Sequence, residues 1–222
     1  MLSQFRYIPP TNPAASDPPK RQKTGLDIDA RVEEWLRDAD DMRVLVFDTE
    51  TTTLRGTIVQ FACVMADQTG KEFKTYCQLW RTTEPIHPGA TAIHHITTTD
   101  LLTSGWDRAT ELSFAIALLT KASEMGISII GHNVSYDVDA LARTAAKEGL
   151  EPPPNISTLC TMRGSRLFCG FTSKNGRSKS PTNEELFIHL FGKAPDARLH
   201  DALNDARVTL ASFVEGRVRG WW

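Results

Sequence analysis

The sequence lacks the features that mark membrane-spanning, secreted and zinc-binding proteins. No apolar run approaches the ~18 residues needed to cross a bilayer, and the first residues have no apolar core of a signal peptide. The four cysteines form no Cys-x-x-Cys pair and have no zinc-ligand spacing, so we expect reduced thiols. The 27 acidic and 25 basic residues nearly cancel, so net charge indicates no class of partner. We expect one intracellular domain, cytoplasmic or nuclear, that is not bound to a membrane.

Short segments flank this domain. Residues 1–24 are rich in proline and poor in large apolar residues, which predicts a disordered tail. The tail ends in PPKRQK, which is either a short nuclear-import signal or a solvated basic stretch. Residues 25–41 predict an N-terminal helix, and residues 218–222 a C-terminal tail in which Trp221 and Trp222 either pack back on the domain or dock a partner. The two tails would allow a polymerase or a repair protein to dock.

Residues 42–217 read as one α/β domain. Three β-rich runs come first, at about 43–48, 57–66 and 72–80, and the turn DQTG separates the last two. Helical and β-rich patterns then alternate, with helices at about 109–125, 139–150, 183–191 and 201–217 and short strands at 127–130 and 157–161. This order predicts a mixed five-stranded sheet, with three antiparallel strands followed by two parallel strands, flanked by helices.

Four acids and a histidine stand at the ends of these elements. In LVFDTETTTL, Asp48 and Glu50 project from the same side of a strand, so they repel unless a cation or a proton is shared between them. Asp137 lies near the start of the helix after ISII, and Asp205 lies in a helix that His200 precedes. Such a set matches a phosphodiester site with two hard cations about 4 Å apart. A histidine can take the proton from the attacking water, a role that we give to His200.

The segments that carry these residues resemble three motifs of one enzyme family. FDTETTTL, HNVSYD and HDALNDA resemble the motifs of the DEDD exonucleases in their histidine branch (DEDDh, DnaQ-like), to which the proofreading subunit of bacterial DNA polymerase III belongs. IHHIT is similar to a segment that many of these enzymes carry. The resemblance covers roughly residues 42–214 and implies a ribonuclease H-like fold and removal of mononucleotides from 3′ ends.

The same resemblance assigns roles to residues. It implies that Mg²⁺ or Mn²⁺, as two ions, is bound by Asp48, Glu50, Asp137 and Asp205, with His200 as the general base. It also implies that Thr51 contacts the terminal nucleotide and that Leu54 wedges against its base. The chain departs from the family at Thr53, where glycine is frequent. Threonine would be strained there if the turn required a positive φ.

A basic segment, 163–179, contains no acid. It is either an element that binds single strands, with cations for phosphates and aromatic rings for bases, or a solvated flexible loop. Its cations and aromatic residues are Arg163, Arg166, Lys174, Arg177, Lys179, Phe168 and Phe171. Of these, Arg163, Arg166, Arg177 and Lys179 are the predicted substrate-binding residues.

The sequence therefore predicts a metal-dependent 3′–5′ exonuclease that acts on single-stranded or frayed DNA and releases 5′-mononucleotides. Two alternatives stay open, the same chemistry on RNA and a non-catalytic module that binds nucleic acid or a polymerase. His132 and Asn133 are interpreted as ordering a loop through hydrogen bonds. The remaining histidines are interpreted as structural or surface residues, although His94 or His95 would be near the cleft.

Overall fold

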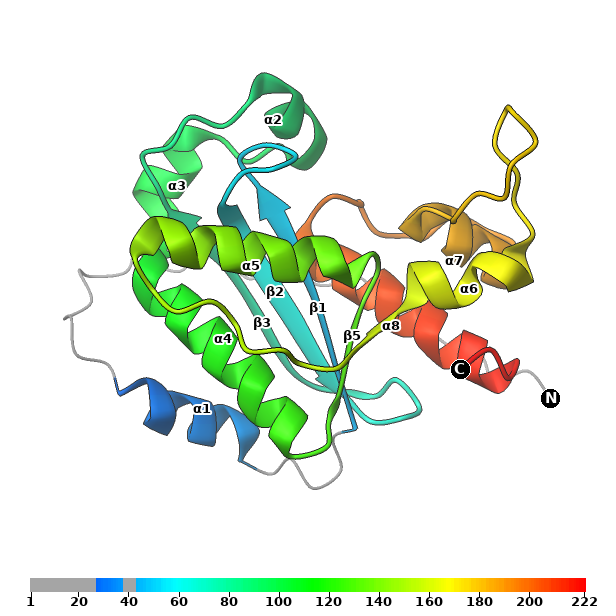
Figure 1. Cartoon of the computed structure of the whole chain (residues 1–222), viewed down its shortest axis with the longest axis horizontal. Coiled ribbons are helices and arrows are strands. Elements are labelled where there is room, and N and C mark those ends of the chain that lie inside the picture. Colours follow the sequence, from blue (N-terminus) through cyan, green and yellow to red (C-terminus); the bar gives the residue numbers. More distant parts are fainter. Residues whose placement is uncertain (1–26, 38–42) are drawn as a thin grey trace.

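A computed structural model of the chain describes residues 27–37 and 43–222 (Figure 1). The predicted tail and its basic PPKRQK stretch lie outside the described residues and stay predictions. Of the predicted N-terminal helix, the described part is α1 (Ile28–Leu36), which Asp27 caps by accepting a hydrogen bond from the Ala30 backbone N–H. Within the described ranges, no helix is long and apolar enough to cross a membrane.

One mixed sheet forms the centre of the domain. β1 (Val44–Thr51), β2 (Ile58–Ala66) and β3 (Glu72–Arg81) are antiparallel, whereas β5 (Ser128–Gly131) runs parallel to β1 and β6 (Thr158–Cys160) parallel to β5. These are the three antiparallel and two parallel strands that the sequence predicts. The prediction of five strands is corrected by a sixth, β4 (Trp106–Asp107), which extends the edge beside β3. A two-residue strand is too short to show a period of two, so no pattern in the sequence indicates it.

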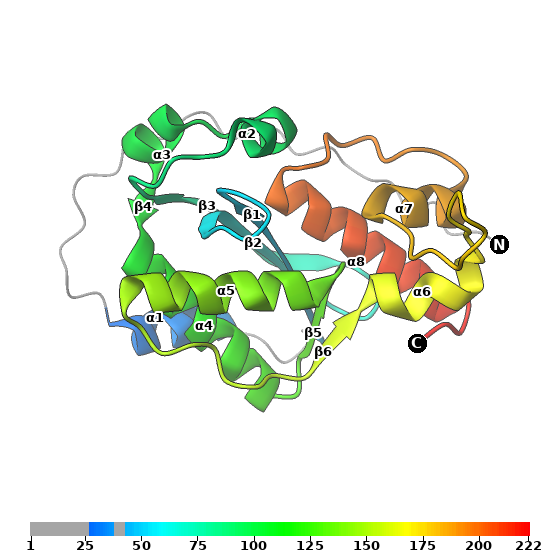
Figure 2. The same ribbon diagram turned by 45° about the horizontal axis from the view of Figure 1, so that its top comes forward.

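Helices cover both faces of the sheet (Figure 2). α4 and α5 pack on one face, with α1 against α4, and α8 packs on the other face, where α6 and α7 lie against it. α2 and α3 precede α4 near the carboxyl end of β1. The bounds are α2 (Pro88–His94), α3 (Thr98–Ser104), α4 (Arg108–Glu124), α5 (Val134–Glu148), α6 (Thr161–Cys169), α7 (Asn183–Phe191) and α8 (Ala202–Val218).

The alternation of side chains along β1 assigns its acids to a face. Leu45 and Phe47 belong to the large apolar cluster that includes residues of α4 and α5, whereas Val44 and Val46 pack with residues of α8. Continuing this period of two, Asp48 and Glu50 face α8 and Thr49 faces α5. β5 pairs with β1 only as far as Val46. From Asp48 onward, β1 therefore has no strand partner among the described residues on the side of β5.

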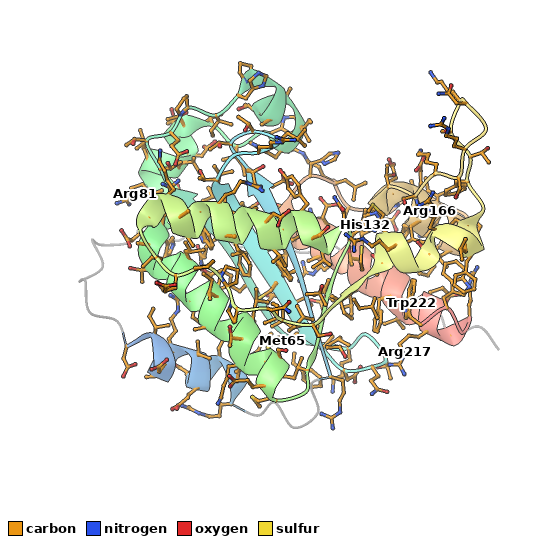
Figure 3. The ribbon with its side chains drawn as sticks, in the orientation of Figure 1. Met65, Arg81, His132, Arg166, Arg217 and Trp222 are labelled. Atoms are coloured by element: carbon orange, nitrogen blue, oxygen red, sulfur yellow. The ribbon has the colours of Figure 1, made fainter. Side chains whose placement is uncertain are left out.

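The C-terminal tryptophans pack back on the domain, which is the first of the two alternatives that the sequence left open for the tail. Trp222 stacks on Phe213 and donates its indole N–H to the Phe213 carbonyl oxygen at 2.9 Å. Its ring fills the space above Gly216, where an added Cβ would lie 2.3 Å from it, and it also meets Gly164 in α6. Trp221 stacks on Phe168, with ring centroids 5.0 Å apart. The tail therefore joins α8 to α6 (Figure 3).

The basic segment 163–179 is only partly a loop. Arg163 and Arg166 lie on α6, so the alternative of a flexible loop is wrong for the first half of the segment. The second half is a narrow hairpin, residues 171–179, in which Lys179 N–H donates to the Phe171 carbonyl oxygen at 2.8 Å and Ser173 N–H to that of Arg177 at 2.8 Å. Arg166 at the base of this hairpin donates to the Ser178 hydroxyl at 3.1 Å and to its carbonyl oxygen at 3.0 Å (Figure 3).

Candidate active site

Three side chains that the sequence predicts as a group meet at the carboxyl end of β1. Glu50 from β1, Asp205 from the first turn of α8 and His200 from the preceding loop each offer a ligand atom, and these atoms lie within 4.8 Å of one another. Asp205 is buried, Glu50 is partly buried and His200 is exposed. Asp48 stands two residues before Glu50 on the same face of β1. The arrangement combines oxygen ligands, which Mg²⁺ and Mn²⁺ prefer, with an imidazole that water can reach.

Asp137 reaches the same place from the other face of the sheet. It lies in the first turn of α5 and is 3% exposed. Its Oδ1 accepts hydrogen bonds from the Thr49 backbone N–H at 3.1 Å and from the Thr49 hydroxyl at 2.7 Å. Thr49 thereby connects the acids on the two faces, a role that the sequence did not indicate because Thr49 points away from Asp48 and Glu50.

Burial and mutual repulsion raise the pKa of each of these carboxyl groups. Burial raises the pKa of Asp48 well above its ordinary value, and the charges of Asp137, Asp205 and Glu50 raise it further. Burial, followed by the charges of Asp205 and Asp137, raises the pKa of Glu50 to about 8. Burial raises the pKa of Asp137 to about 7 although Thr49 opposes it, and burial also raises the pKa of Asp205. Without a cation, the cluster would therefore hold protons near neutral pH.

The backbone around His200 is shaped by Asp205. His200 has a φ of 63°, in the left-handed region that non-glycine residues rarely adopt, and its N–H donates to Asp205 Oδ2 at 2.6 Å. The other oxygen, Asp205 Oδ1, accepts a hydrogen bond from the Asn183 side-chain amide at 3.2 Å. Asn183 begins α7, and the sequence reasoning missed it because no spacing relates it to the acids. The carboxylate of Asp205 is thus fixed at both oxygens, and the His200 ring is left exposed.

A cleft of about 640 Å³ opens beside Glu50. Its walls are the turn after β1, α2 and Tyr136 of α5, and Leu54 stands at its rim with 80% of its surface exposed. The Thr51 hydroxyl donates to the Thr53 carbonyl oxygen at 2.8 Å, so the Tyr136 hydroxyl, 2.7 Å away, must donate to Thr51 Oγ1. Thr53 is not among the described residues with a positive φ, so the strain considered for this turn is absent.

His94 also lines this cleft, as the sequence allowed for His94 or His95. It is buried, and its Nδ1 accepts the Ile96 backbone N–H at 3.0 Å, so its Nε2 carries the proton and donates to the Thr51 carbonyl oxygen at 3.3 Å. Burial lowers the pKa of His94, which favours this neutral form. His94 therefore holds the end of β1 against α2 as a neutral hydrogen-bond donor.

His132 has the structural role that the sequence predicts. It follows β5 and lies where α5 and α6 meet (Figure 3). Its Nδ1 is 3.0 Å from the Thr161 hydroxyl, and its Nε2 donates to the Pro181 carbonyl oxygen at 3.1 Å. Burial lowers the pKa of His132 to about 4, so the ring is neutral at physiological pH. Asn133 is the N-cap residue of α5 and is in the left-handed region with a φ of 63°. Its side chain makes no capping hydrogen bond, so the predicted ordering through hydrogen bonds is not seen at the start of this helix.

The predicted substrate-binding cations differ in whether their side chains already have hydrogen-bond or ion-pair partners within the protein. Arg163 donates to the Ser135 hydroxyl at 3.0 Å and so lies beside the first turn of α5. Lys179 is paired with Glu185 at 2.5 Å, which neutralises part of its charge. Arg166 is bound to the hairpin, as described above. The Arg177 side chain is exposed and has no hydrogen-bond or ion-pair partner among the described residues.

Comparison with known proteins assigns the family. A sequence model described as exonuclease (RNase T) matches residues 45–213. The chain belongs to the exonuclease family. No curated protein sequence matches it with significance. The family match confirms the resemblance to the DnaQ-like 3′–5′ exonucleases, and membership implies dependence on a divalent metal ion, for which Glu50, His200 and Asp205 offer ligands.

Solved exonuclease structures share the fold of this exonuclease. Exonuclease X in complex with 5′ overhanging duplex DNA is 26% identical, with a TM-score of 0.54 over 81% of this chain and 94% of that one. Escherichia coli exonuclease I in complex with a dA16 oligonucleotide is 17% identical, with a TM-score of 0.63, and exonuclease I from Methylocaldum szegediense is 20% identical, with a TM-score of 0.58. Each of these two matches covers 79% of this chain and about 40% of the other protein. The ribonuclease H-like fold is thereby confirmed.

Proposed function

We propose that this exonuclease removes 5′-mononucleotides from the 3′ ends of single-stranded or frayed DNA, with two Mg²⁺ or Mn²⁺ ions and His200 as the general base. The observation that carries the proposal is the convergence of Glu50, Asp205 and His200 within 4.8 Å at the edge of a cleft, with Asp48 and Asp137 beside them. Structural sites do not need four repelling carboxyl groups in partly buried positions, whereas a cation site does.

The residues present fit divalent cations. Asp48, Glu50, Asp137 and Asp205 would hold them, because their raised pKa values show that the folded chain leaves their negative charges uncompensated. When bound, two such ions stabilise the negative charge that develops on the phosphodiester and lower the pKa of a water molecule. Thr49 keeps Asp137 oriented through its two hydrogen bonds.

We assign the transfer of the proton to His200. Its ring is exposed beside Glu50 and Asp205, and its backbone is fixed by the 2.6 Å hydrogen bond to Asp205. In this role His200 takes a proton from the attacking water, and the new P–O bond forms as the bond to the 3′ oxygen of the shortened strand breaks. The terminal nucleotide then leaves with a 5′-phosphate. Histidine suits this step because its ordinary pKa lies near neutral pH.

The cleft would receive the terminal nucleotide. The Thr51 backbone and hydroxyl, fixed by His94 and Tyr136, face its sugar and phosphate, and Leu54 at the rim would wedge against its base. The carboxyl end of β1, the start of α8 and the 171–179 hairpin follow one another across the molecule in both views (Figures 1 and 2). A strand leaving the cleft along this line would pass Arg163 and reach Arg177.

DNA is the favoured polymer because exonuclease X and exonuclease I were solved with DNA. RNA is the second candidate, since a site that recognises a 3′ hydroxyl and phosphates accepts either polymer unless it contacts the 2′ position. A non-catalytic binding module would retain the fold but would have no need for the acids and the exposed histidine.

The test is degradation of 5′-labelled single-stranded DNA and of the matching RNA by purified protein with Mg²⁺ or Mn²⁺. We expect a ladder that shortens from the 3′ end, faster on DNA, and lost in His200→Ala. His189→Ala is the matched control, because His189 is exposed on α7 and its ring packs against the rings of Phe171 and Trp221, away from the acids. Faster degradation of RNA would show that RNA, and not DNA, is the preferred substrate. No degradation with either metal would favour the non-catalytic binding module.

A further inference from the structure

A buried glutamine on β2, the strand beside the acids of β1, is hydrogen-bonded to the start of α8. Gln60 is 7% exposed and stands directly opposite Glu50 in the antiparallel register, so both side chains project toward α8. Its Oε1 accepts the Ala202 backbone N–H at 3.1 Å, and its Nε2 donates to Asp201 Oδ2 at 3.2 Å. Its Nε2 also lies 3.5 Å from Cys77 Sγ. Because Oε1 meets a donor and Nε2 meets the Asp201 carboxylate, the amide has a single orientation.

Ala202 and Asp201, the two closer partners of this amide, belong to the start of α8. Asp201 is the N-cap residue, and its Oδ1 accepts the Asn204 N–H at 3.2 Å. The Ala202 N–H belongs to the first turn, where a helix provides no carbonyl partner. His200 directly precedes this turn, and Asp205 closes it by donating its N–H to the Asp201 carbonyl oxygen at 2.9 Å.

We propose that Gln60 is a positioning residue for the reaction, which fixes the distance of His200 and Asp205 from Glu50 by clamping the first turn of α8 to β2. This inference rests on the proposed function, because it assigns Gln60 to the same site. The amide acts through hydrogen bonds to the backbone and to Asp201, and contact with substrate is not part of its role. Groups that orient metal ligands typically matter by about 10-fold to 100-fold in activity or metal affinity, and Gln60 acts on the ligands through the first turn of α8.

Four variants separate the effect of the Gln60 hydrogen bonds on the reaction from the effects of side-chain volume and of added charge. Gln60→Met keeps nearly the same volume and removes the hydrogen bonds to Ala202 and Asp201, together with the longer one to Cys77. Gln60→Glu keeps the acceptor for Ala202 but sets a carboxylate against Asp201 and Glu50. The double variant Gln60→Glu/Asp201→Asn exchanges donor and acceptor between the two side chains and restores the formal charge. Gln68→Glu adds the same charge in the β2–β3 turn, where Gln68 is exposed.

The experiment measures the single-turnover rate on single-stranded DNA, the Kd for that DNA, the Mn²⁺ concentration that gives half of the maximal rate and hydrogen exchange at the Ala202 amide. We expect Gln60→Met and Gln60→Glu to slow the reaction by about 10-fold to 100-fold and to raise the Mn²⁺ requirement, with DNA affinity almost unchanged. Exchange at Ala202 should accelerate in Gln60→Met. The double variant should recover most of the rate, and Gln68→Glu should match the wild type.

The outcomes distinguish this inference from the proposed function. A wild-type protein that degrades no nucleic acid overturns the proposed function, and the positioning role with it. An active wild type whose rate and Mn²⁺ requirement are unchanged in both single variants overturns the positioning role alone. A double variant no faster than Gln60→Glu overturns the hydrogen-bond clamp as the cause. If Gln60→Met does not fold, the comparison of Gln60→Glu with the double variant still decides the question.

Discussion

Raising the pH in the absence of metal should destabilise this exonuclease, and a divalent metal should restore the loss. Glu50 has a pKa of about 8 in the folded protein and 4.5 ordinarily, because burial and neighbouring acids oppose its charge. The folded chain therefore holds a proton on Glu50 at pH values where the unfolded chain has released it. The stability that Glu50 contributes is complete below pH 4.5 and is lost as the pH rises through 8.

The size of this loss follows from the shift. Between pH 4.5 and pH 7 the unfolded state gains about 1.4 kcal/mol for each pH unit, so Glu50 alone costs about 3 kcal/mol at pH 7. In a chain of 222 residues, 1 kcal/mol corresponds to roughly 2–4 °C, so the Tm should fall by about 6–12 °C. Asp137, whose pKa is raised to about 7, adds to the same trend.

Thermal unfolding measured from pH 5 to pH 8, with a chelator or with Mn²⁺, checks this prediction. We expect a falling Tm in the chelator and a nearly constant Tm with Mn²⁺. Glu50→Gln should reduce the fall in the chelator, because it removes a carboxyl group whose pKa is raised to about 8, whereas Glu124→Gln on the exposed surface of α4 should leave the fall unchanged. A Tm that is independent of pH without metal, or a fall that Glu50→Gln does not reduce, would refute the reasoning.

Three further substitutions test other contacts of the site. Thr49→Val removes the 2.7 Å hydrogen bond to Asp137 and should weaken Mn²⁺ binding by about 10-fold in a metal titration, and an unchanged affinity would contradict the orienting role of Thr49. Arg177→Glu should raise the KM for single-stranded DNA and reduce the slope of log KM against log salt concentration by about one. A slope equal to that of the wild type would show that Arg177 contacts no phosphate. Tyr136→Phe removes the hydrogen bond to Thr51 and should lower the free energy of unfolding by about 1 kcal/mol in urea titrations, and wild-type values for both unfolding and kcat would argue that this bond is unimportant.

The sequence predicted the β1 half of the site because a strand has a simple period. Asp48 and Glu50 are two residues apart, so they had to share a face whatever the rest of the fold did. Asp137 and Asp205 lie near the helix starts to which HNVSYD and HDALNDA assigned them, although α5 begins at Val134, before the predicted helix at 139–150. These positions depend on local structure, which neighbouring residues in the chain largely determine.

The basic segment shows where local reasoning failed. A flexible loop was one of the two alternatives for this segment, but Gly164 lies inside α6, where an added Cβ would come 2.9 Å from the ring of Trp222. The glycine is therefore explained by a residue 58 positions later in the chain. A contact of this kind leaves no periodic signal in the sequence.

By itself, the sequence determined the order of five strands, but it did not indicate α2, α3, α6 or β4. It also determined the strand with its paired acids, and the acids and the histidine that we propose as the site. Only the tertiary structure decided how far apart they lie. Thr49, Asn183 and Gln60 orient the acids from elements that are distant in the chain, and β5 ends early enough to admit Asp137 to the edge of β1. The reason is that side-chain direction along a strand or helix is a local property, whereas the distance between two elements depends on all the packing and hydrogen bonding between them.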